Sequence, residues 1–379
     1  MMHIYRYLRL LCWTTPILIW SAIRLFGLVI CLSPGFVRFL WYYHVTADRK
    51  PIHFARESCR QTLDVYSIKQ HTDQSPALAA AAPVVIFYTG GAWMMGYKMW
   101  GALLARALNA AGIVVVIPDM RNYPWASVPS MVNDTDKSLA WTLDNISSYG
   151  GDPAKVVVVG QSAGGHVACT ALLRRANILL LSEEEKSDTE SCASSDSTEY
   201  ASLCSNWSPT DIKGFIFLSA PLSLDAMEHT FGRYGFDKHL VDRMFGGDRE
   251  NYDPQRILSS LQQNGHQSTL NLPPIRIYHG SLDQTVPTVC SETFYAMLQN
   301  VVVDRTQISY TCYEGWSHTD AILEGPMDAD HRFHKDIFHA IQEWTNDSPN
   351  LIWSDDDPRN KHRLCPHFLV CAARFCNPF

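Results

Sequence analysis

A serine in a turn of small residues is the first feature of this sequence that suggests chemistry. Residues 160–164 read Gly-Gln-Ser-Ala-Gly, a G-x-S-x-G pattern that directly follows the valine run 156–159 and directly precedes a helical stretch. Where such a pattern joins a strand to a helix, the turn is so tight that the serine is strained and its hydroxyl is exposed. We therefore predict that Ser162 is a nucleophile.

A serine hydroxyl is a weak nucleophile near neutral pH, so the sequence must also supply a base and a carboxylate. In hydrolases that place the serine on a strand-to-helix turn, the chain order is serine, acid, histidine. Asp283 follows the predicted strand 275–279, and His318 follows the predicted strand 308–313. Because both fall in loops after late strands, we predict Asp283 as the acid and His318 as the base.

Other residues offer alternatives for these two roles. Asp225 and Asp320 are alternative acids. His166 lies on the helix after the serine and His279 ends a strand, so both favour a structural role over that of the base. The predicted acid could also simply cap a helix, and the predicted base could be an exposed loop residue.

A tetrahedral intermediate at the serine needs backbone N–H groups aimed at its oxyanion. Residues 89–93 read Thr-Gly-Gly-Ala-Trp and follow the predicted strand 84–88, where hydrolases of this kind carry an HGGG-type loop. Glycine lets the backbone approach a ligand closely. We predict an oxyanion hole made by Gly90, Gly91 and the N–H of Ala163; a plain glycine turn is the alternative.

Short runs rich in β-branched residues alternate with helical stretches over most of the chain. This alternation is typical of a mostly parallel sheet with helices on both faces, and it predicts an α/β protein with the α/β-hydrolase fold over residues 47–345. The predicted strands are 84–88, 114–118, 156–160, 215–218, 275–279 and 308–313, and the predicted helices are 100–111, 128–149 and 162–175.

Composition excludes several classes of protein. The 379 residues include 31 Lys and Arg against 38 Asp and Glu, a net charge of −7, so nucleic acid is not an expected partner. Hydrophobic residues make up 46%, which excludes a mainly disordered chain. The 11 cysteines are odd in number and lack C-x-x-C spacing, so we expect reduced thiols, no metal site and no cofactor.

The first 45 residues contain no acidic residue and are mostly apolar, which predicts a membrane anchor over residues 1–46. Pro16 and Arg24 interrupt the apolar run, and Ser-Pro-Gly at 33–35 divides it. One span, a helical hairpin and an interfacial anchor therefore remain open. A cleaved signal peptide is a further alternative, although no A-x-A-like cleavage site follows.

Two further segments do not follow the alternation of strands and helices. Residues 181–210 are rich in serine and glutamate and cannot bury enough apolar surface to offset the entropy of ordering, so we expect a disordered acidic insertion within the one domain. Residues 346–379 form a Cys-rich tail that contains Cys365, Cys371 and Cys376.

Several motifs together resemble the isoprenylcysteine α-carbonyl methylesterases, membrane-bound serine hydrolases related to the hormone-sensitive-lipase and carboxylesterase group. The similarity covers roughly residues 56–344 without the acidic insertion, and Thr89 stands where most broader relatives have histidine. The motifs lie at 89–98, 119–124, 150–153, 160–164 and 318–320.

The resemblance implies hydrolysis of the methyl ester on the C-terminal prenylated cysteine of lipidated proteins. The implied partners are a prenylated, carboxyl-methylated protein or a prenylcysteine methyl ester, together with membrane lipid. The implied location is the endoplasmic reticulum or Golgi membrane, with the catalytic domain facing the cytosol. Residues 222–258, rich in Met and Phe, would form either a prenyl pocket or an ordinary packed cap. A general membrane-associated carboxylesterase or lipid hydrolase and, more remotely, a non-catalytic scaffold are the alternatives.

Overall fold

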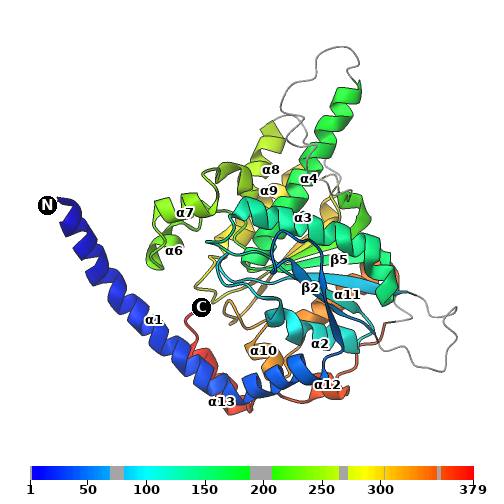
Figure 1. The fold of residues 1–379 in the computed structure, drawn as a ribbon, viewed down its shortest axis with the longest axis horizontal. Coiled ribbons are helices and arrows are strands. Elements are labelled where there is room, and N and C mark those ends of the chain that lie inside the picture. Colours follow the sequence, from blue (N-terminus) through cyan, green and yellow to red (C-terminus); the bar gives the residue numbers. More distant parts are fainter. Residues whose placement is uncertain (1, 69–80, 188–206, 264–271, 303, 348–350) are drawn as a thin grey trace.

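Six runs rich in valine and isoleucine form the parallel part of one sheet. The computed structural model describes residues 2–68, 81–187, 207–263, 272–302, 304–347 and 351–379. Its eight strands are ordered β1-β2-β4-β3-β5-β6-β7-β8, antiparallel from β1 to β4 through β2 and parallel elsewhere (Figure 1). They are β1 Arg49–His53, β2 Thr62–Tyr66, β3 Ala82–Tyr88, β4 Val114–Asp119, β5 Gly151–Gln161, β6 Ile212–Leu218, β7 Ile275–Gly280 and β8 Ile308–Tyr313.

The α/β-hydrolase fold predicted from the sequence is confirmed, and all six predicted strands are present. The antiparallel pair β1 and β2 was not predicted. The strand β1 has the sequence RKPIH and no fully buried residue, and β2 carries the buried Asp64 at its centre. Neither strand shows the continuous apolar run by which a buried parallel strand is recognised.

Alternating side chains along each central strand face two separate cores. In β5, Val156 and Val158 pack on one face, and Val157 and Val159 on the other. The first face is covered by α3 Val128–Asn145, α4 Ala163–Ser187, α8 Pro254–Gln263 and α9 Val289–Val301. The second is covered by α1 Met2–Trp41, α2 Ala102–Ala110, α11 Arg332–Thr345 and α13 His367–Cys376 (Figure 1).

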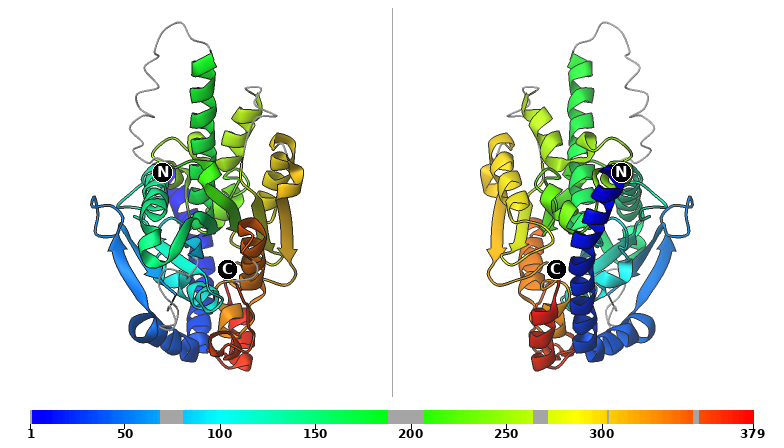
Figure 2. Two further views of the ribbon diagram at one scale, coloured as in Figure 1. Left: turned by 90° about the vertical axis from the view of Figure 1, so that its right-hand side faces the viewer. Right: turned by 90° about the vertical axis from the view of Figure 1, so that its left-hand side faces the viewer.

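The N-terminal segment is one continuous helix, α1, followed by a π-helical turn at Tyr42–Thr46. It passes through residues 33–35 without a turn, so the helical hairpin is excluded. Ile19–Thr46 is long and apolar enough to span a membrane. One side of this stretch is buried in the protein through Leu28, Leu32 and Phe39, because the helix lies along the hydrolase domain beside α13 (Figure 2).

The ends of the predicted disordered insertion are ordered. The helix α4 continues to Ser187, and Trp207 is buried with its indole N–H 2.8 Å from Asp136 Oδ1. Apolar packing at Trp207 overrides the polar composition of its neighbours. Residues 188–206 of the insertion lie outside the described residues, so that part stays a prediction.

The tail is also an integral part of the fold. A short helix, α12 Pro358–Lys361, precedes α13, and Cys365 between them is fully buried against α1. The tail cysteines Cys365, Cys371 and Cys376 are free thiols, as are Cys31, Cys59, Cys169, Cys290 and Cys312.

Candidate active site

The serine of the G-x-S-x-G turn sits between β5 and α4. Ser162 has φ 53°, a left-handed conformation that a non-glycine residue rarely adopts. The neighbouring glycines are required by space: a Cβ on Gly164 would lie 2.3 Å from the Tyr88 carbonyl oxygen, and one on Gly160 would lie 2.5 Å from Gly165 Cα. The sequence therefore permits a tight turn at this point, and the turn presents the Ser162 hydroxyl above the sheet.

Three loops bring Ser162, His318 and Asp283 together. His318 Nε2 is 2.9 Å from Ser162 Oγ, and His318 Nδ1 is 2.7 Å from Asp283 Oδ2. The three residues follow β5, β8 and β7, and the carboxyl ends of parallel strands meet at one edge of the sheet. The sequence predicted these three residues, and the structure places them within hydrogen-bonding distance.

The carboxylate of Asp283 is fully buried but well compensated. Its Oδ1 accepts hydrogen bonds of 2.9 Å from the backbone N–H groups of Thr285 and Val286. Burial by itself would raise the pKa of Asp283, but the charge and hydrogen bonds of the His318 and His279 rings hold that pKa well below its usual range. An ionised Asp283 keeps the proton of His318 on Nδ1, which leaves Nε2 free to accept the serine proton.

A second histidine contacts the same carboxylate, which the sequence did not reveal. His279 Nε2 lies 3.3 Å from Asp283 Oδ2 and 2.9 Å from the Val286 carbonyl oxygen, and Nδ1 lies 2.7 Å from Ser291 Oγ. With all of these partners His279 supports the acid, in line with the structural role predicted for it.

The alternative acids lie elsewhere. Asp320 accepts hydrogen bonds from Ser317 at 2.8 Å and from Arg374 at 2.7 Å. Asp225 forms half-exposed ion pairs with Arg249 and Arg256. Neither carboxylate is hydrogen-bonded to His318, so Asp283 is the acid that the geometry selects.

The alternative base is also accounted for. His166 Nδ1 accepts a hydrogen bond of 3.3 Å from the Trp93 indole, and its Nε2 lies 2.9 Å from the Tyr252 carbonyl oxygen. Complete burial lowers the pKa of His166 to about 3. This neutral ring is a packing residue.

The predicted oxyanion hole agrees with the structure only in part. Gly91 has φ 134° and closely approaches Gly96, so the loop requires glycine there, and Ala163 opens α4 directly behind the nucleophile. The N–H of Gly90, however, donates to Gln161 Oε1 at 3.0 Å. The expectation for Gly90 therefore does not hold in this structure, because a side chain already occupies its N–H.

Gln161 is the functional residue that sequence reasoning missed. Its Nε2 lies 3.3 Å from His318 Nε2, while its Oε1 accepts from Gly90. Because the Gly90 donor fixes which end of the amide is oxygen, the NH2 end must face the lone pair of the His318 ring. Its place between Gly160 and Ser162 in the G-x-S-x-G turn was the available signal.

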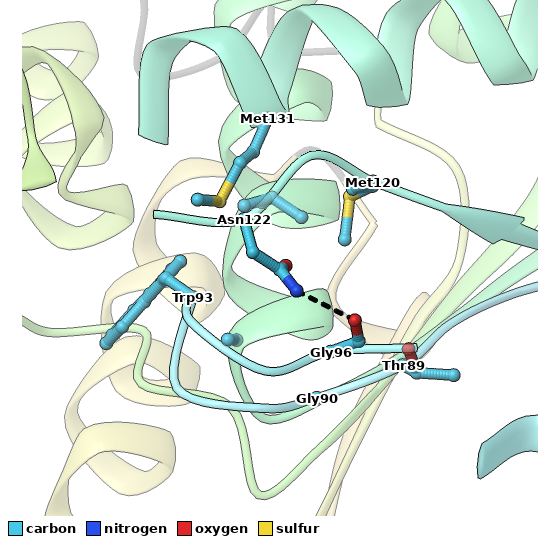
Figure 3. Close-up of a pocket in the computed structure, with 9 residues that line it drawn as sticks. Thr89, Gly90, Trp93, Gly96, Met120, Asn122 and Met131 are labelled. Atoms are coloured by element: carbon cyan, nitrogen blue, oxygen red, sulfur yellow. Dashed lines mark hydrogen bonds between the residues drawn. The ribbon is translucent and has the colours of Figure 1, made fainter. Parts of the chain in front are cut away.

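A small cavity adjoins the loop of residues 89–96, which carries the predicted oxyanion hole and is called the oxyanion loop below (Figure 3). The loop is anchored at the Gly96 carbonyl oxygen, which accepts from Asn122 at 2.8 Å and from Arg60 at 2.7 Å. The cavity is lined by Thr89, Gly90, Trp93, Gly96, Met120, Asn122, Met131, Ala163 and Val167. Its lining is mostly apolar, and its volume of about 10 Å³ has room for about one water-sized group.

The Met- and Phe-rich segment 222–258 packs as an ordinary cap. It includes α6 Glu228–Arg233 and α7 Lys238–Met244. Phe245 is fully buried, with its ring centroid 5.6 Å from that of Trp93, and Phe231 lies 6.2 Å from the same indole. These side chains fill the core above the oxyanion loop, so the structure favours the packed cap over an open prenyl pocket.

Such an arrangement suits acyl transfer, since it combines a nucleophile, a base and a base-orienting carboxylate. In the part of the chain that the structure describes, no three His, Cys, Asp or Glu side chains are grouped as metal ligands.

The fold is that of the α/β-hydrolase class, and solved esterases share it. Esterase 2 from Thermogutta terrifontis is 20% identical with a TM-score of 0.54, over 80% of this chain and 93% of that one. Esterase B from Lactobacillus rhamnosis is 16% identical with a TM-score of 0.60, over 86% and 98%. At such identities the likeness shows the fold alone.

Sequence comparison defines the family. A family model described as BD-FAE matches residues 63–298. The probable isoprenylcysteine alpha-carbonyl methylesterase ICMEL1 of Oryza sativa subsp. japonica is 30% identical over 92% of this chain and 75% of its own length, and the Arabidopsis thaliana enzyme ICME is 31% identical over 92% and 74%. The chain belongs to the isoprenylcysteine alpha-carbonyl methylesterase family, and it is a carboxylic-ester hydrolase.

Proposed function

We propose that this protein removes the methyl ester from the C-terminal prenylated cysteine of lipidated proteins through an acyl-enzyme on Ser162. The observation that carries the mechanism is the pair of hydrogen bonds that His318 makes, 2.9 Å to Ser162 and 2.7 Å to Asp283. The names of the relatives ICMEL1 and ICME, both isoprenylcysteine alpha-carbonyl methylesterases, support the substrate class.

In the first half of the reaction, His318 Nε2 takes the Ser162 proton and Oγ attacks the ester carbonyl carbon. Backbone N–H groups of Gly91 and Ala163 stabilise the oxyanion. The C–O bond to the methoxy group then breaks, and His318 gives its proton to the departing methanol. In the second half, His318 takes a proton from water and the hydroxide attacks the acyl carbon. The bond between that carbon and Ser162 Oγ then breaks, and the protonated His318 gives its proton to the departing Oγ. The net change is ester plus water to carboxylic acid plus methanol.

Location at a membrane is part of the same proposal, with the hydrolase domain at the cytosolic face of the endoplasmic reticulum or Golgi. A prenylated substrate partitions into lipid, so an enzyme held at the same surface meets it most readily. The outward side of α1 supports this location because its exposed side chains are mostly large and apolar: Ile19, Trp20, Ile23, Phe26, Ile30, Val37 and Trp41. Alkaline carbonate extraction and protease protection of the full chain in membranes test both points.

The deciding experiment is a substrate panel on the purified protein. We expect the free acid and methanol from N-acetyl-farnesylcysteine methyl ester, with a higher kcat/KM than for the same ester lacking the prenyl group. Ser162→Ala, checked for folding by circular dichroism, should lose all turnover above background. Undiminished turnover in that variant contradicts the mechanism.

One observation favours a second candidate, a general membrane-associated carboxylesterase. The cavity beside Ala163 is small, and Phe231 and Phe245 are packed in the core. Short acyl esters would fit such a site at least as well as a prenylated one. Higher kcat/KM on short acyl esters than on the prenylcysteine ester would select this candidate.

A further inference from the structure

The loop that carries His318 is held by a side chain from the tail. Asn377, which follows α13, is buried, and its Nδ2 lies 3.0 Å from Ser317 Oγ and 2.8 Å from Thr319 Oγ1. These are the residues immediately before and after His318. A single amide group therefore binds the side-chain hydroxyls of the residues on both sides of the predicted base.

A buried carboxyl group completes this cluster. Glu324, fully buried at the start of α10 Glu324–Met327, accepts at Oε1 from Asn377 Nδ2 at 2.7 Å and from Thr319 Oγ1 at 3.0 Å. The two N–H bonds of the Asn377 amide are thus shared among three oxygens. Each of these oxygens would otherwise be buried with fewer partners, which costs stability.

The tail makes one more contact with the same loop. Arg374 Nε donates to Asp320 Oδ1 at 2.7 Å, and Asp320 Oδ2 accepts from the backbone and hydroxyl of Ser317 at 2.8 Å. The His318 loop is therefore tied to the tail at three of its residues, 317, 319 and 320. The nearby Gly315, at φ 77°, shows that the chain turns sharply before this loop.

The tail segment also reaches the N-terminal helix and the cap. Arg24 of α1 donates to the backbone oxygen of Asn377, and the Cys376 side chain packs against Gly27. From the cap, the Tyr234 hydroxyl donates to the Pro378 carbonyl oxygen at 3.4 Å. In Figure 1 the end of the tail lies between α1 and α6, so this segment connects the apolar helix to the loop of the base.

We propose that Asn377 is a positioning residue for His318, and that its backbone contact with Arg24 makes the alignment of the base depend on how α1 is seated. The proposal rests on the roles proposed for Ser162 and His318. A base must be held within a fraction of an ångström, and a misplacement of about 1 Å can cost about 10²-fold in rate. Asn377 is the residue that binds both neighbours of the base at once, while Asp320 binds only Ser317 and Glu324 only Thr319.

The test compares Asn377→Asp with the wild-type full chain on a short-chain nitrophenyl ester. The substitution keeps the shape of the side chain but removes both N–H donors, and it sets a second carboxyl group against Glu324. We expect kcat to fall by about 10- to 100-fold with KM within about twofold. The rate of Ser162 inactivation by an organophosphonate, which needs the same base, should fall by the same factor.

Two companion variants sharpen the test. Phe375→Ala changes a residue on α13 that is 87% exposed and should leave kcat at the wild-type value. Arg24→Gln should lower kcat by a smaller factor, about two- to tenfold, because Asn377 keeps its own side-chain contacts.

The outcomes separate this proposal from the proposed function. If Ser162→Ala is inactive while Asn377→Asp keeps full kcat and full organophosphonate reactivity, only the positioning role is overturned. A lower melting temperature with unchanged kcat, measured well below the transition, also overturns it, because it shows a purely structural residue. If Ser162→Ala is active, the nucleophile itself has been assigned wrongly.

Discussion

Two buried carboxyl groups lie near His318, and their pKa values are shifted in opposite directions. Asp283 contacts the imidazole ring, and its pKa is held well below the usual range by His318 and His279. Glu324 does not contact the ring. It binds the hydroxyl of Thr319, the residue after His318, and the side-chain amide of Asn377. Burial, with the nearby Asp320 charge, raises the pKa of Glu324 to about 7.

The difference shows what each side of the base requires. In the proposed mechanism the imidazole ring of His318 gains a positive charge, so the carboxylate beside the ring has to be ionised. Glu324, by contrast, has only to keep the His318 loop in position. Neutral hydrogen bonds are enough for that, and an unpaired buried charge would be costly. Glu324 Oε2 accordingly has no hydrogen-bond partner among the described residues.

The strongest challenge to this comparison is to neutralise Asp283. Asp283→Asn keeps the size of the side chain but removes the charge that orients the His318 ring and stabilises its protonated form. We expect kcat to fall by about 10⁴-fold with the fold intact. Steady-state kinetics beside a circular dichroism spectrum check this prediction, and a loss below tenfold would argue against Asp283 as the acid.

Gln161→Glu changes a residue that contacts the His318 ring, and we expect it to have an intermediate effect on activity. The new carboxylate can still accept from Gly90, but it faces His318 Nε2 with a negative charge instead of an N–H donor. A negative charge favours the protonated ring, so the base is lost at a higher pH than in the wild type. We expect the acid limb of the kcat/KM profile to move up by about one pH unit, which lowers kcat/KM about tenfold on that limb.

The matching change at the second carboxyl group is Glu324→Gln. We expect kcat to stay within about threefold of wild type, since the amide oxygen still accepts from Asn377 and the site carries no required charge. The contrast with the isosteric Asp283→Asn substitution is the sharpest form of the comparison. Equal losses of kcat in both variants would contradict it.

Glu324→Gln should also change how stability depends on pH. Because the folded pKa of Glu324, about 7, lies above the unfolded value near 4.5, the folded state holds a proton that the unfolded state has lost in this interval. Wild-type stability is therefore fully present below about pH 4.5 and falls as the pH rises to about 7. At pH 8 the Gln variant should be more stable by about 3 kcal/mol, measured by urea unfolding, with little difference at pH 4.5.

The smallest effect is expected at Asp225, one of the two alternative acids that the sequence allowed. Its ion pairs with Arg249 and Arg256 are half-exposed, and such pairs contribute less than about 1 kcal/mol. Asp225→Asn should leave kcat unchanged and lower the free energy of unfolding by no more than that amount. A large loss of kcat in this variant would reopen the assignment of the acid.

Much of the site was predictable because its signals are local. The nucleophile turn needs small residues within five positions, and the acid and the base each follow a strand that can be recognised from its apolar run. The contacts of Gln161 were not predictable, because its amide bonds to Gly90 and His318, which are 71 and 157 residues away. The sequence shows that a glutamine lies inside the motif, but it does not show which residues that glutamine binds.

The N-terminal helix and the tail illustrate the same limit. Composition predicted an apolar anchor and a Cys-rich tail, and the continuous α1 removed the hairpin alternative. Nothing in either segment indicates that Leu28 and Leu32 would be buried beside α13, because the apolar face of a helix does not show whether lipid or protein covers it.

The amino-acid sequence was enough to predict the α/β-hydrolase class and the parallel core, and to propose Ser162, Asp283 and His318 as site residues. Strand periodicity and turn composition depend on residues that are close together in the chain. The contacts that hold the His318 loop, in contrast, depend on how the whole chain packs. Asn377 meets Ser317 across 60 residues and Arg24 across 353, and such contacts exist only once the sheet, α1 and the tail have packed together.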